Sequence, residues 1–214
     1  MKKKNIVISL ILILVAVIFT ILVCTFDVKD VGINGTKIGF STINRQIFEA
    51  IGENSLCKTV SDVLGYFALG LVGFYALIGL YQLIQRKSIF KVDGEILALG
   101  GFYVAVLVLY VLFEKIIINY RPVLENGELA ASFPSSHTLL TICVCISAIW
   151  VNGKLFKSDM TKIFNYLLIL VAFVTIVGRL LAGVHWFTDI VGGILISSAL
   201  LMCFKTVLDG GEDK

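Results

Sequence analysis

The chain has 214 residues, of which 58% are hydrophobic and 15% are charged, and its formal net charge is +3. Because soluble domains carry about 25% charged residues, this composition and the repeated long apolar runs exclude a soluble domain and indicate an integral membrane protein. The small net charge gives no reason to expect a nucleic-acid partner, and five cysteines without a CxxC spacing form no disulfide framework.

The first apolar run, Ile6–Cys24, contains no charged residue and follows three consecutive lysines. A secretory signal usually has an apolar core of about 7–15 residues and a small-x-small cleavage site. This run is longer, and no Ala-x-Ala follows it. We therefore expect a retained first membrane span over residues 6–24.

A polar segment, Asp27–Asp62, follows the first span. Four apolar residues recur within it at helical spacing: Phe40, Ile43, Ile47 and Ile51. This pattern predicts a short amphipathic helix over about residues 40–52, lying on the membrane surface. Two roles are open for it, packing against the helix bundle or guiding a lipid towards a site.

Five further apolar runs complete the predicted architecture. They cover about residues 63–84, 96–113, 136–151, 162–178 and 186–204. The sequence thus predicts an all-α fold, a six-transmembrane-helix bundle that forms a single membrane-embedded domain over residues 1–214. The last three runs are shorter than the ~20 residues that a bilayer core usually needs. A polar pocket sunk into the outer end of the bundle would explain this.

The distribution of Lys and Arg orients the chain, because six spans place both termini on one side of the membrane. The termini and the loops after the second and fourth spans hold eleven of these residues, and the other side holds seven. Three of the seven, Lys115, Arg121 and Arg179, belong to the candidate site below. The remaining eleven against four predict that both termini are cytoplasmic and that residues 114–137 and 178–189 face outside.

Three polar segments meet at this outer end. They are Lys115-x5-Arg121-Pro122, then Pro134-Ser135-Ser136-His137, then Arg179-x5-His185-x3-Asp189. The segments contain both histidines and both prolines of the protein. Charged groups at the edge of hydrocarbon are costly, so their convergence predicts a functional site.

The charges in these segments suit phosphate chemistry. Lys115, Arg121 and Arg179 share one predicted side without matching carboxylates, and guanidinium groups select phosphate oxygens by bidentate geometry. Ser135 and Ser136 precede a helix, whose free amides and nearby hydroxyls favour an anion. We therefore expect phosphoryl transfer to a nitrogen nucleophile, and no set of residues with metal-ligand spacing is visible.

His185 and Asp189 are four residues apart, so on a helix they share one face. A carboxylate one turn from a histidine can fix its tautomer and stabilise its cation, which suits a nucleophile or an acid–base group. Plainer readings exist for single parts: the pair as a polar helix cap at the interface, and Lys115 as a snorkelling lysine. Their joint occurrence on one predicted face favours the site.

Together the three segments resemble the signature motifs of the type 2 phosphatidic acid phosphatase superfamily. This superfamily includes membrane lipid phosphatases, bacterial acid phosphatases and vanadium haloperoxidases. Its usual pattern is Lys-x6-Arg-Pro, then Pro-Ser-Gly-His, then Ser-Arg-x5-His-x3-Asp. The resemblance covers roughly Glu114–Asp189, and the six-span layout is similar to that of the membrane branch.

The resemblance implies a role for each matching residue. His185 matches the nucleophile that forms a phosphohistidine, Asp189 its orienting carboxylate, and His137 the general acid. The implied substrate-binding residues are Arg121, Arg179 and Ser135, with Lys115 and Ser136 beside them. No cofactor is implied.

Three positions depart from the family pattern. Glu114 stands where the usual count places lysine, so Lys115 reaches the site only if the helix end is shifted or overwound. Ser136 replaces a glycine, which narrows the approach to the phosphate and adds a hydroxyl. Gly178 replaces a serine, which removes one hydroxyl contact.

The sequence therefore predicts a metal-independent lipid phosphatase in the cell membrane, with its site facing outside. Undecaprenyl pyrophosphate is the first candidate substrate, because an outward site in a short chain fits its recycling. Phosphatidylglycerophosphate, phosphatidic acid and diacylglycerol pyrophosphate fit almost as well. Nothing in the sequence predicts an oligomeric state.

Two other classes of protein are open alternatives. A non-catalytic protein that binds or translocates a lipid phosphate would explain the departures at Glu114 and Gly178, although binding alone does not need His137, His185 and Asp189. A vanadate-dependent haloperoxidase shares the anion site, but those proteins are soluble and larger, which the six predicted spans argue against.

Overall fold

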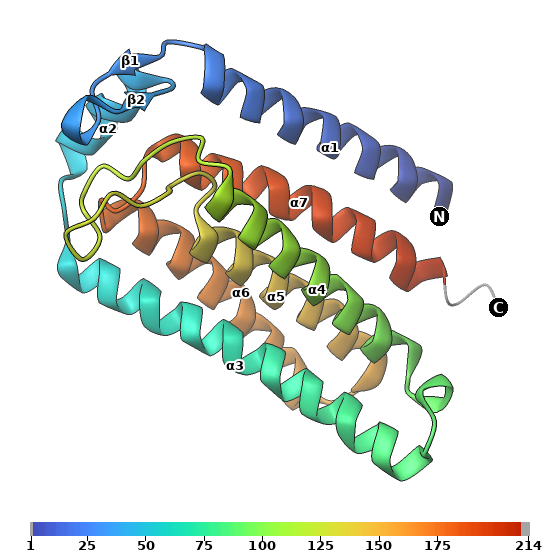
Figure 1. The fold of residues 1–214 in the computed structure, drawn as a ribbon. Coiled ribbons are helices and arrows are strands. Elements are labelled where there is room, and N and C mark those ends of the chain that lie inside the picture. The colour runs from blue at the N-terminus through green and yellow to red at the C-terminus, as the bar shows by residue number, and fades with distance from the viewer. Residues whose placement is uncertain (1, 211–214) are drawn as a thin grey trace.

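The computed structural model describes residues 2–210, which form seven α-helices and one small hairpin (Figure 1). The helices are α1 (Lys2–Thr25), α2 (Ser41–Ile51), α3 (Ser55–Arg86), α4 (Gly94–Lys115), α5 (Ser136–Leu155), α6 (Asp159–Leu181) and α7 (Phe187–Gly210). The hairpin pairs β1 (Lys29–Asp30) with β2 (Lys37–Ile38), and 3-10 turns cover Ile33–Gly35 and Ile89–Lys91.

Six of these helices, all except α2, are long and apolar enough to cross a membrane. The prediction of a mostly helical six-span bundle is therefore confirmed, and the hairpin is an addition that the sequence pattern did not indicate. The expected polar tail begins at Lys205, and its residues 211–214 lie outside the described part of the chain.

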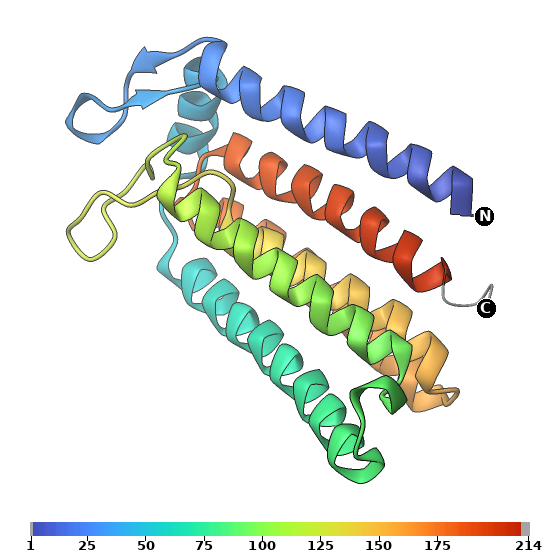
Figure 2. The ribbon, with the colours of Figure 1, turned by 45° about the vertical axis from the view of Figure 1, so that its right-hand side comes forward.

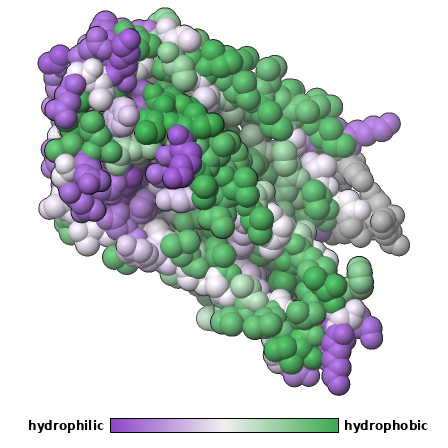
Figure 3. Space-filling model, in the orientation of Figure 1, coloured by the Kyte–Doolittle hydropathy of each residue, from purple (hydrophilic) through white to green (hydrophobic). Residues whose placement is uncertain are grey.

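The long helices run side by side, and polar structure gathers at the two ends of the bundle. The start of α1 and the end of α7 lie at one end, while α2, the hairpin and the segment between α4 and α5 lie at the other (Figures 1 and 2). Figure 3 shows hydrophilic residues concentrated at these ends, with a hydrophobic band between them. This distribution is the one expected of a protein that spans a bilayer.

Helix α5 is the innermost span. Of its most apolar window, 61% is buried, against 17% for α1 and 22% for α4, although α5 has the lowest mean hydropathy of the six. One of its buried polar side chains, Asn152, meets partners inside the bundle: Tyr75 donates a hydrogen bond of 2.6 Å to Asn152 Oδ1, and Asn152 Nδ2 donates to Asn165 at 3.0 Å. Polar groups in a bilayer avoid lipid in this way.

The predicted amphipathic helix corresponds to α2, which packs against the start of α7. Asn44 is fully buried, and its Nδ2 donates to Gly39 O and to Thr188 Oγ1, both at 2.8 Å. Its Oδ1 accepts from the Thr188 amide at 3.1 Å, and Phe48 contacts Trp186 with ring centroids 5.6 Å apart. Of the two roles left open, these contacts support packing.

Helix α3 begins at Ser55, earlier than the predicted span at residue 63. Asn54 caps the helix, because its side chain accepts a hydrogen bond of 3.0 Å from the Cys57 amide. The sequence placed Lys58 and Asp62 in a polar connecting segment. In the structure both lie on the first turns of a membrane-spanning helix.

Candidate active site

The loop between α6 and α7 carries His185 into the end of the bundle where α2 and the hairpin lie. It turns at Gly183, which has a φ of +69°, and a Cβ at this position would lie 2.3 Å from the carbonyl oxygen of Gly52. The turn thus needs both the left-handed conformation and the missing side chain of glycine. As a result the loop lies tight against the segment between α2 and α3, and His185 is only 3% exposed.

The two ring nitrogens of His185 differ in their surroundings. Nδ1 lies 3.1 Å from the carbonyl oxygen of Ser132 and 3.7 Å from Asp189 Oδ2. Because a carbonyl oxygen only accepts, the proton sits on Nδ1 and the lone pair on Nε2. Nε2 is buried and has no hydrogen-bond partner among the described residues, so it is the free nitrogen of the site.

Asp189 fixes the loop from which His185 projects. Its Oδ2 accepts a hydrogen bond of 2.8 Å from the Trp186 amide, and its own carbonyl accepts from the Ser135 amide at 3.0 Å. Asp189 therefore ties together the starts of α5 and α7. The predicted pairing of His185 with Asp189 is present in the structure, with Ser132 as a second partner of the imidazole.

Burial holds the pKa of His185 well below its usual range, and the positive charges of Arg121 and Arg179 lower that pKa further. His185 is therefore a neutral imidazole near neutral pH. A neutral ring with a free nitrogen is the form required of a nucleophile.

Arg121 lies on the same side of the site as His185 and is 7% exposed. Its Nε donates to the carbonyl oxygen of Ala131 at 3.2 Å, and its terminal nitrogen forms a 3.0 Å ion pair with Glu125. Both partners come from the segment between α4 and α5. That segment thus fixes the guanidinium while leaving further donors for an anion.

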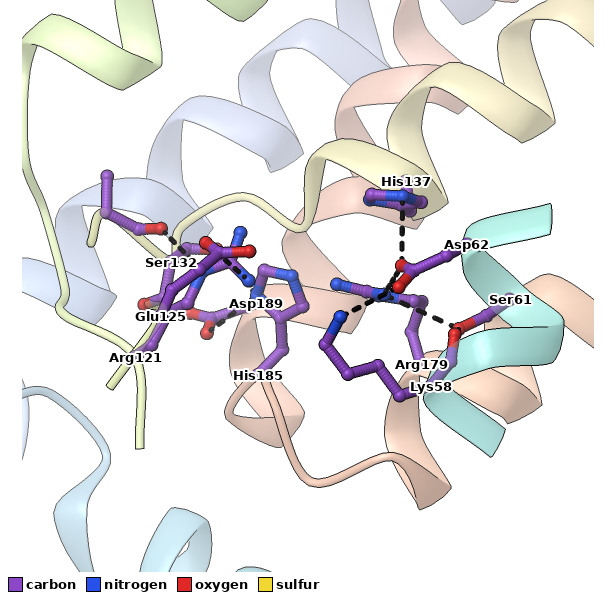
Figure 4. Close-up of polar contacts among 11 residues, drawn as sticks. Lys58, Ser61, Asp62, Arg121, Glu125, Ser132, His137, Arg179, His185 and Asp189 are labelled. Atoms are coloured by element: carbon purple, nitrogen blue, oxygen red, sulfur yellow. Dashed lines mark hydrogen bonds and ion pairs between the residues drawn. The ribbon is translucent and has the colours of Figure 1, made fainter. Parts of the chain in front are cut away.

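Arg179 lies on the other side, where one carboxylate joins several groups. Its terminal nitrogen forms a 2.6 Å ion pair with Asp62 Oδ1, which also lies 3.4 Å from His137 Nε2. Lys58 Nζ pairs with Asp62 Oδ2 at 2.8 Å. Figure 4 shows Lys58, His137 and Arg179 arranged around Asp62, with His185 between this cluster and Arg121.

The two predicted serines stand at the start of α5. Ser135 is the residue before the helix and is fully buried, but its side chain makes no capping bond. Its Oγ has no partner among the residues described. Ser136 begins the helix and lines a cavity together with His137. Ser136 therefore shares the cavity wall with the general-acid candidate, and Ser135 precedes it at the start of the same helix.

The structure does not bring Lys115 to this cluster. Lys115 is the last residue of α4 and is exposed, and no contact described within residues 2–210 joins it to the arginines or the histidines. Glu114 instead lines a small cavity that His185 also borders. The position that the family pattern gives to lysine therefore carries a carboxylate here.

Sequence reasoning missed four site residues: Lys58, Asp62, Glu125 and Ser132. One signal was available for the first two, because Asn54 is a favoured helix cap and the Lys58–Asp62 pair has the i,i+4 spacing of a helix. No sequence signal identifies Ser132, since it contributes its backbone carbonyl to His185.

A cavity of about 980 Å³ runs from His137, in the cluster around Asp62, along the bundle between α3 and α4. Its wall includes Gly65 and His137 near the cluster, and Leu83 on α3 far from it. The helix rises about 1.5 Å per residue, so the stretch of α3 from Gly65 to Leu83 spans about 27 Å. The lining is almost entirely apolar, which suits a hydrocarbon chain.

The charges of the site favour an anion over a cation. The side chains of Lys58, Arg121 and Arg179 all contribute positive charge to the site. Among the described residues, no group of three or more His, Cys, Asp and Glu side chains is arranged to hold a metal ion. Phosphate is one of the anions, with carboxylates, whose oxygens match the bidentate geometry of arginine.

Comparison with known proteins agrees with this reading. The sequence profile of the PAP2 superfamily, the type 2 phosphatidic acid phosphatases, matches residues 98–210. Among solved structures, the chain is similar to a transmembrane PAP2-type phosphatidylglycerolphosphate phosphatase from Bacillus subtilis, with a TM-score of 0.65 and 20% sequence identity over 92% of this chain and 94% of that one. No curated protein matches the chain.

Proposed function

Since the chain belongs to the PAP2 superfamily and is a phosphoric ester hydrolase, we propose that it hydrolyses a phosphomonoester or pyrophosphate on a membrane lipid through a phosphohistidine at His185. The observation that carries the proposal is the free Nε2 of His185, which lies between Arg121 and the cluster of Arg179 and His137. His137 also lines one end of the long apolar cavity.

In the first step Arg121 and Arg179 bind the phosphoryl oxygens and His185 Nε2 attacks phosphorus. The bond from phosphorus to the leaving oxygen breaks, and His137 donates its proton to that oxygen. The hydrogen bond from Nδ1 to Ser132 and the nearby Asp189 carboxylate stabilise the ring as it gains positive charge.

In the second step a water molecule attacks the phosphohistidine. His137 takes a proton from this water, the phosphorus–nitrogen bond breaks, and inorganic phosphate leaves. His185 returns to its neutral form. Stabilisation of the phosphoryl charge by the two guanidinium groups is expected to be the largest contribution to the rate.

The cavity supports a lipid substrate with a long chain. Its stretch along α3 approaches the roughly 30 Å of a bilayer core, and its polar end lies at His137. Undecaprenyl pyrophosphate is the first candidate, and phosphatidylglycerophosphate is the second because the solved relative is described as acting on it. The distribution of Lys and Arg supports an outward site with both termini in the cytoplasm.

The proposal is tested by phosphate release from purified protein in detergent with EDTA present. The panel contains undecaprenyl pyrophosphate, phosphatidylglycerophosphate and phosphatidic acid, and His185→Ala is measured beside the wild type. We expect release that persists in EDTA and falls at least about a thousandfold in the variant. Wild-type rates in His185→Ala would reject the mechanism, and the ranking of rates decides between the lipids.

A further inference from the structure

The family pattern and this chain differ at three positions of the motifs, Glu114, Ser136 and Gly178, and α3 packs directly against one of them, Gly178. Glu114 occupies the lysine position and Gly178 the serine position. A Cβ on Gly178 would lie 3.2 Å from Cβ of Ser61, and the Ser61 hydroxyl is 3.4 Å from the Arg179 guanidinium. The first turns of α3 therefore contact the site at Gly178, where the motif serine is missing, and at the neighbouring Arg179.

Lys58 is the only ammonium group among the described residues for which a contact with this cluster is recorded. It lies 2.8 Å from Asp62 Oδ2, while the other oxygen of the same carboxylate meets Arg179 at 2.6 Å and His137 at 3.4 Å. One anionic group thus contacts an ammonium, a guanidinium and an imidazole together. A phosphoryl group offers the same kind of charged oxygens with one more acceptor.

The site also keeps unused donors that point to an anion. Arg179 is 1% exposed, and its Nε has no partner among the residues described, as is the case for the buried hydroxyl of Ser135. A buried guanidinium nitrogen without a hydrogen-bond partner lowers the stability of the folded protein. A phosphoryl group that entered beside Asp62 would supply acceptors for both.

We propose that Lys58 is the third cation of the phosphate site and binds a phosphoryl oxygen of the substrate, in the role that the family pattern gives to the missing lysine. The inference rests on the proposed function for the identity of the anion. Asp62 is the counter-ion of Lys58 and Arg179 in the free protein and yields these contacts when a phosphate monoester or diphosphate binds.

The test must separate binding of phosphate from neutralisation of Asp62, because Lys58→Met alone would leave the Asp62 carboxylate less well paired. Lys58→Met is therefore compared with Lys58→Arg in an Asp62→Asn background. Lys162→Met in the same background is the matched control, since Lys162 also pairs with an aspartate, Asp159, at the start of a span, at 2.9 Å.

Two readouts are measured for each variant in detergent. One is KM for the best lipid of the panel, and the other is the rise in melting temperature caused by inorganic phosphate, which does not depend on turnover. We expect Lys58→Met to weaken phosphate binding about tenfold or more relative to Asp62→Asn. Lys58→Arg should retain most of the affinity, and Lys162→Met all of it.

Equal phosphate binding by Asp62→Asn and by the double variant with Lys58→Met would overturn the inference, as would loss of binding in Lys115→Met instead. Failure of the proposed function is a separate outcome. It would appear as wild-type protein that releases no phosphate from any lipid, while the melting shift with inorganic phosphate still decides the role of Lys58.

Discussion

The two halves of the site differ in the burial of their side chains. The His185 half consists of Arg121, Ser132, His185 and Asp189, all less than 9% exposed. The Asp62 half consists of Lys58, Asp62 and His137, whose side chains are 45%, 25% and 31% exposed. Arg179 joins them (Figure 4).

This difference assigns different tasks to the halves. Buried groups whose hydrogen bonds come from the backbone keep their positions before substrate arrives, which suits the nucleophile. Exposed groups that pair with each other can exchange partners at little cost, which suits admission and release of phosphate. Substitutions in the His185 half should therefore lower kcat, and those at exposed carboxylates should change affinity.

The largest effect is expected for Asp189→Asn. The neutral amide lacks the negative charge that stabilises the His185 ring as it becomes positive, so kcat should fall about a thousandfold with KM little changed. The measurement is steady-state phosphate release, with the melting temperature as the control for folding. A change confined to KM would contradict the assignment of Asp189 to the fixed half.

A smaller effect, on pH dependence, is expected for Arg121→Gln. The positive charge of Arg121 helps to keep the pKa of His185 low, so its removal favours the imidazolium and raises that pKa. As the pH falls, His185 is then protonated at a higher pH than in the wild type. The acid limb of the profile of kcat/KM against pH should therefore shift to higher pH. Arg121→Lys, which keeps the charge, should leave the limb in place; an unmoved limb in Arg121→Gln would rule out this coupling.

The smallest effect is expected for Glu125→Gln, at the exposed edge of the His185 half. Glu125 pairs with Arg121 at 3.0 Å and its side chain is 39% exposed, so it competes weakly with an anion for the guanidinium. Inorganic phosphate should inhibit the variant about two- to fivefold more tightly. Weaker inhibition would show that Glu125 is needed to hold Arg121 in position.

The sequence was sufficient to predict the spans and most of the His185 half. Hydrophobic runs identify spans because lipid excludes charge, and His185, Asp189 and Arg121 sit at fixed spacings that a resemblance can match. The family model likewise matches residues 98–210, a range that contains Arg121, His185 and Asp189. Residues that act through backbone groups, such as Ser132, leave no such pattern.

In the Asp62 half, His137 was predicted from its motif, but Lys58 and Asp62 were not, because their place in the site depends on how α3 packs against α5 and α6. The charges of Lys58 and Asp62 made the start of α3 look like a connecting segment, although the Asn54 cap marks a helix there. The meeting of Asp62 with Arg179 joins residues far apart in the chain, and no periodicity within either helix predicts it.

The central claim is that His185 is the nucleophile, and trapping of the phosphoenzyme tests it most directly. Protein mixed with its best lipid substrate is quenched in alkali within milliseconds, and the peptide that contains His185 is analysed by mass spectrometry. The account predicts a phosphoryl group on His185 in the wild type, more of it in His137→Ala if water attack is slowed, and none in His185→Ala. Full turnover without phosphorylation of His185 would contradict it.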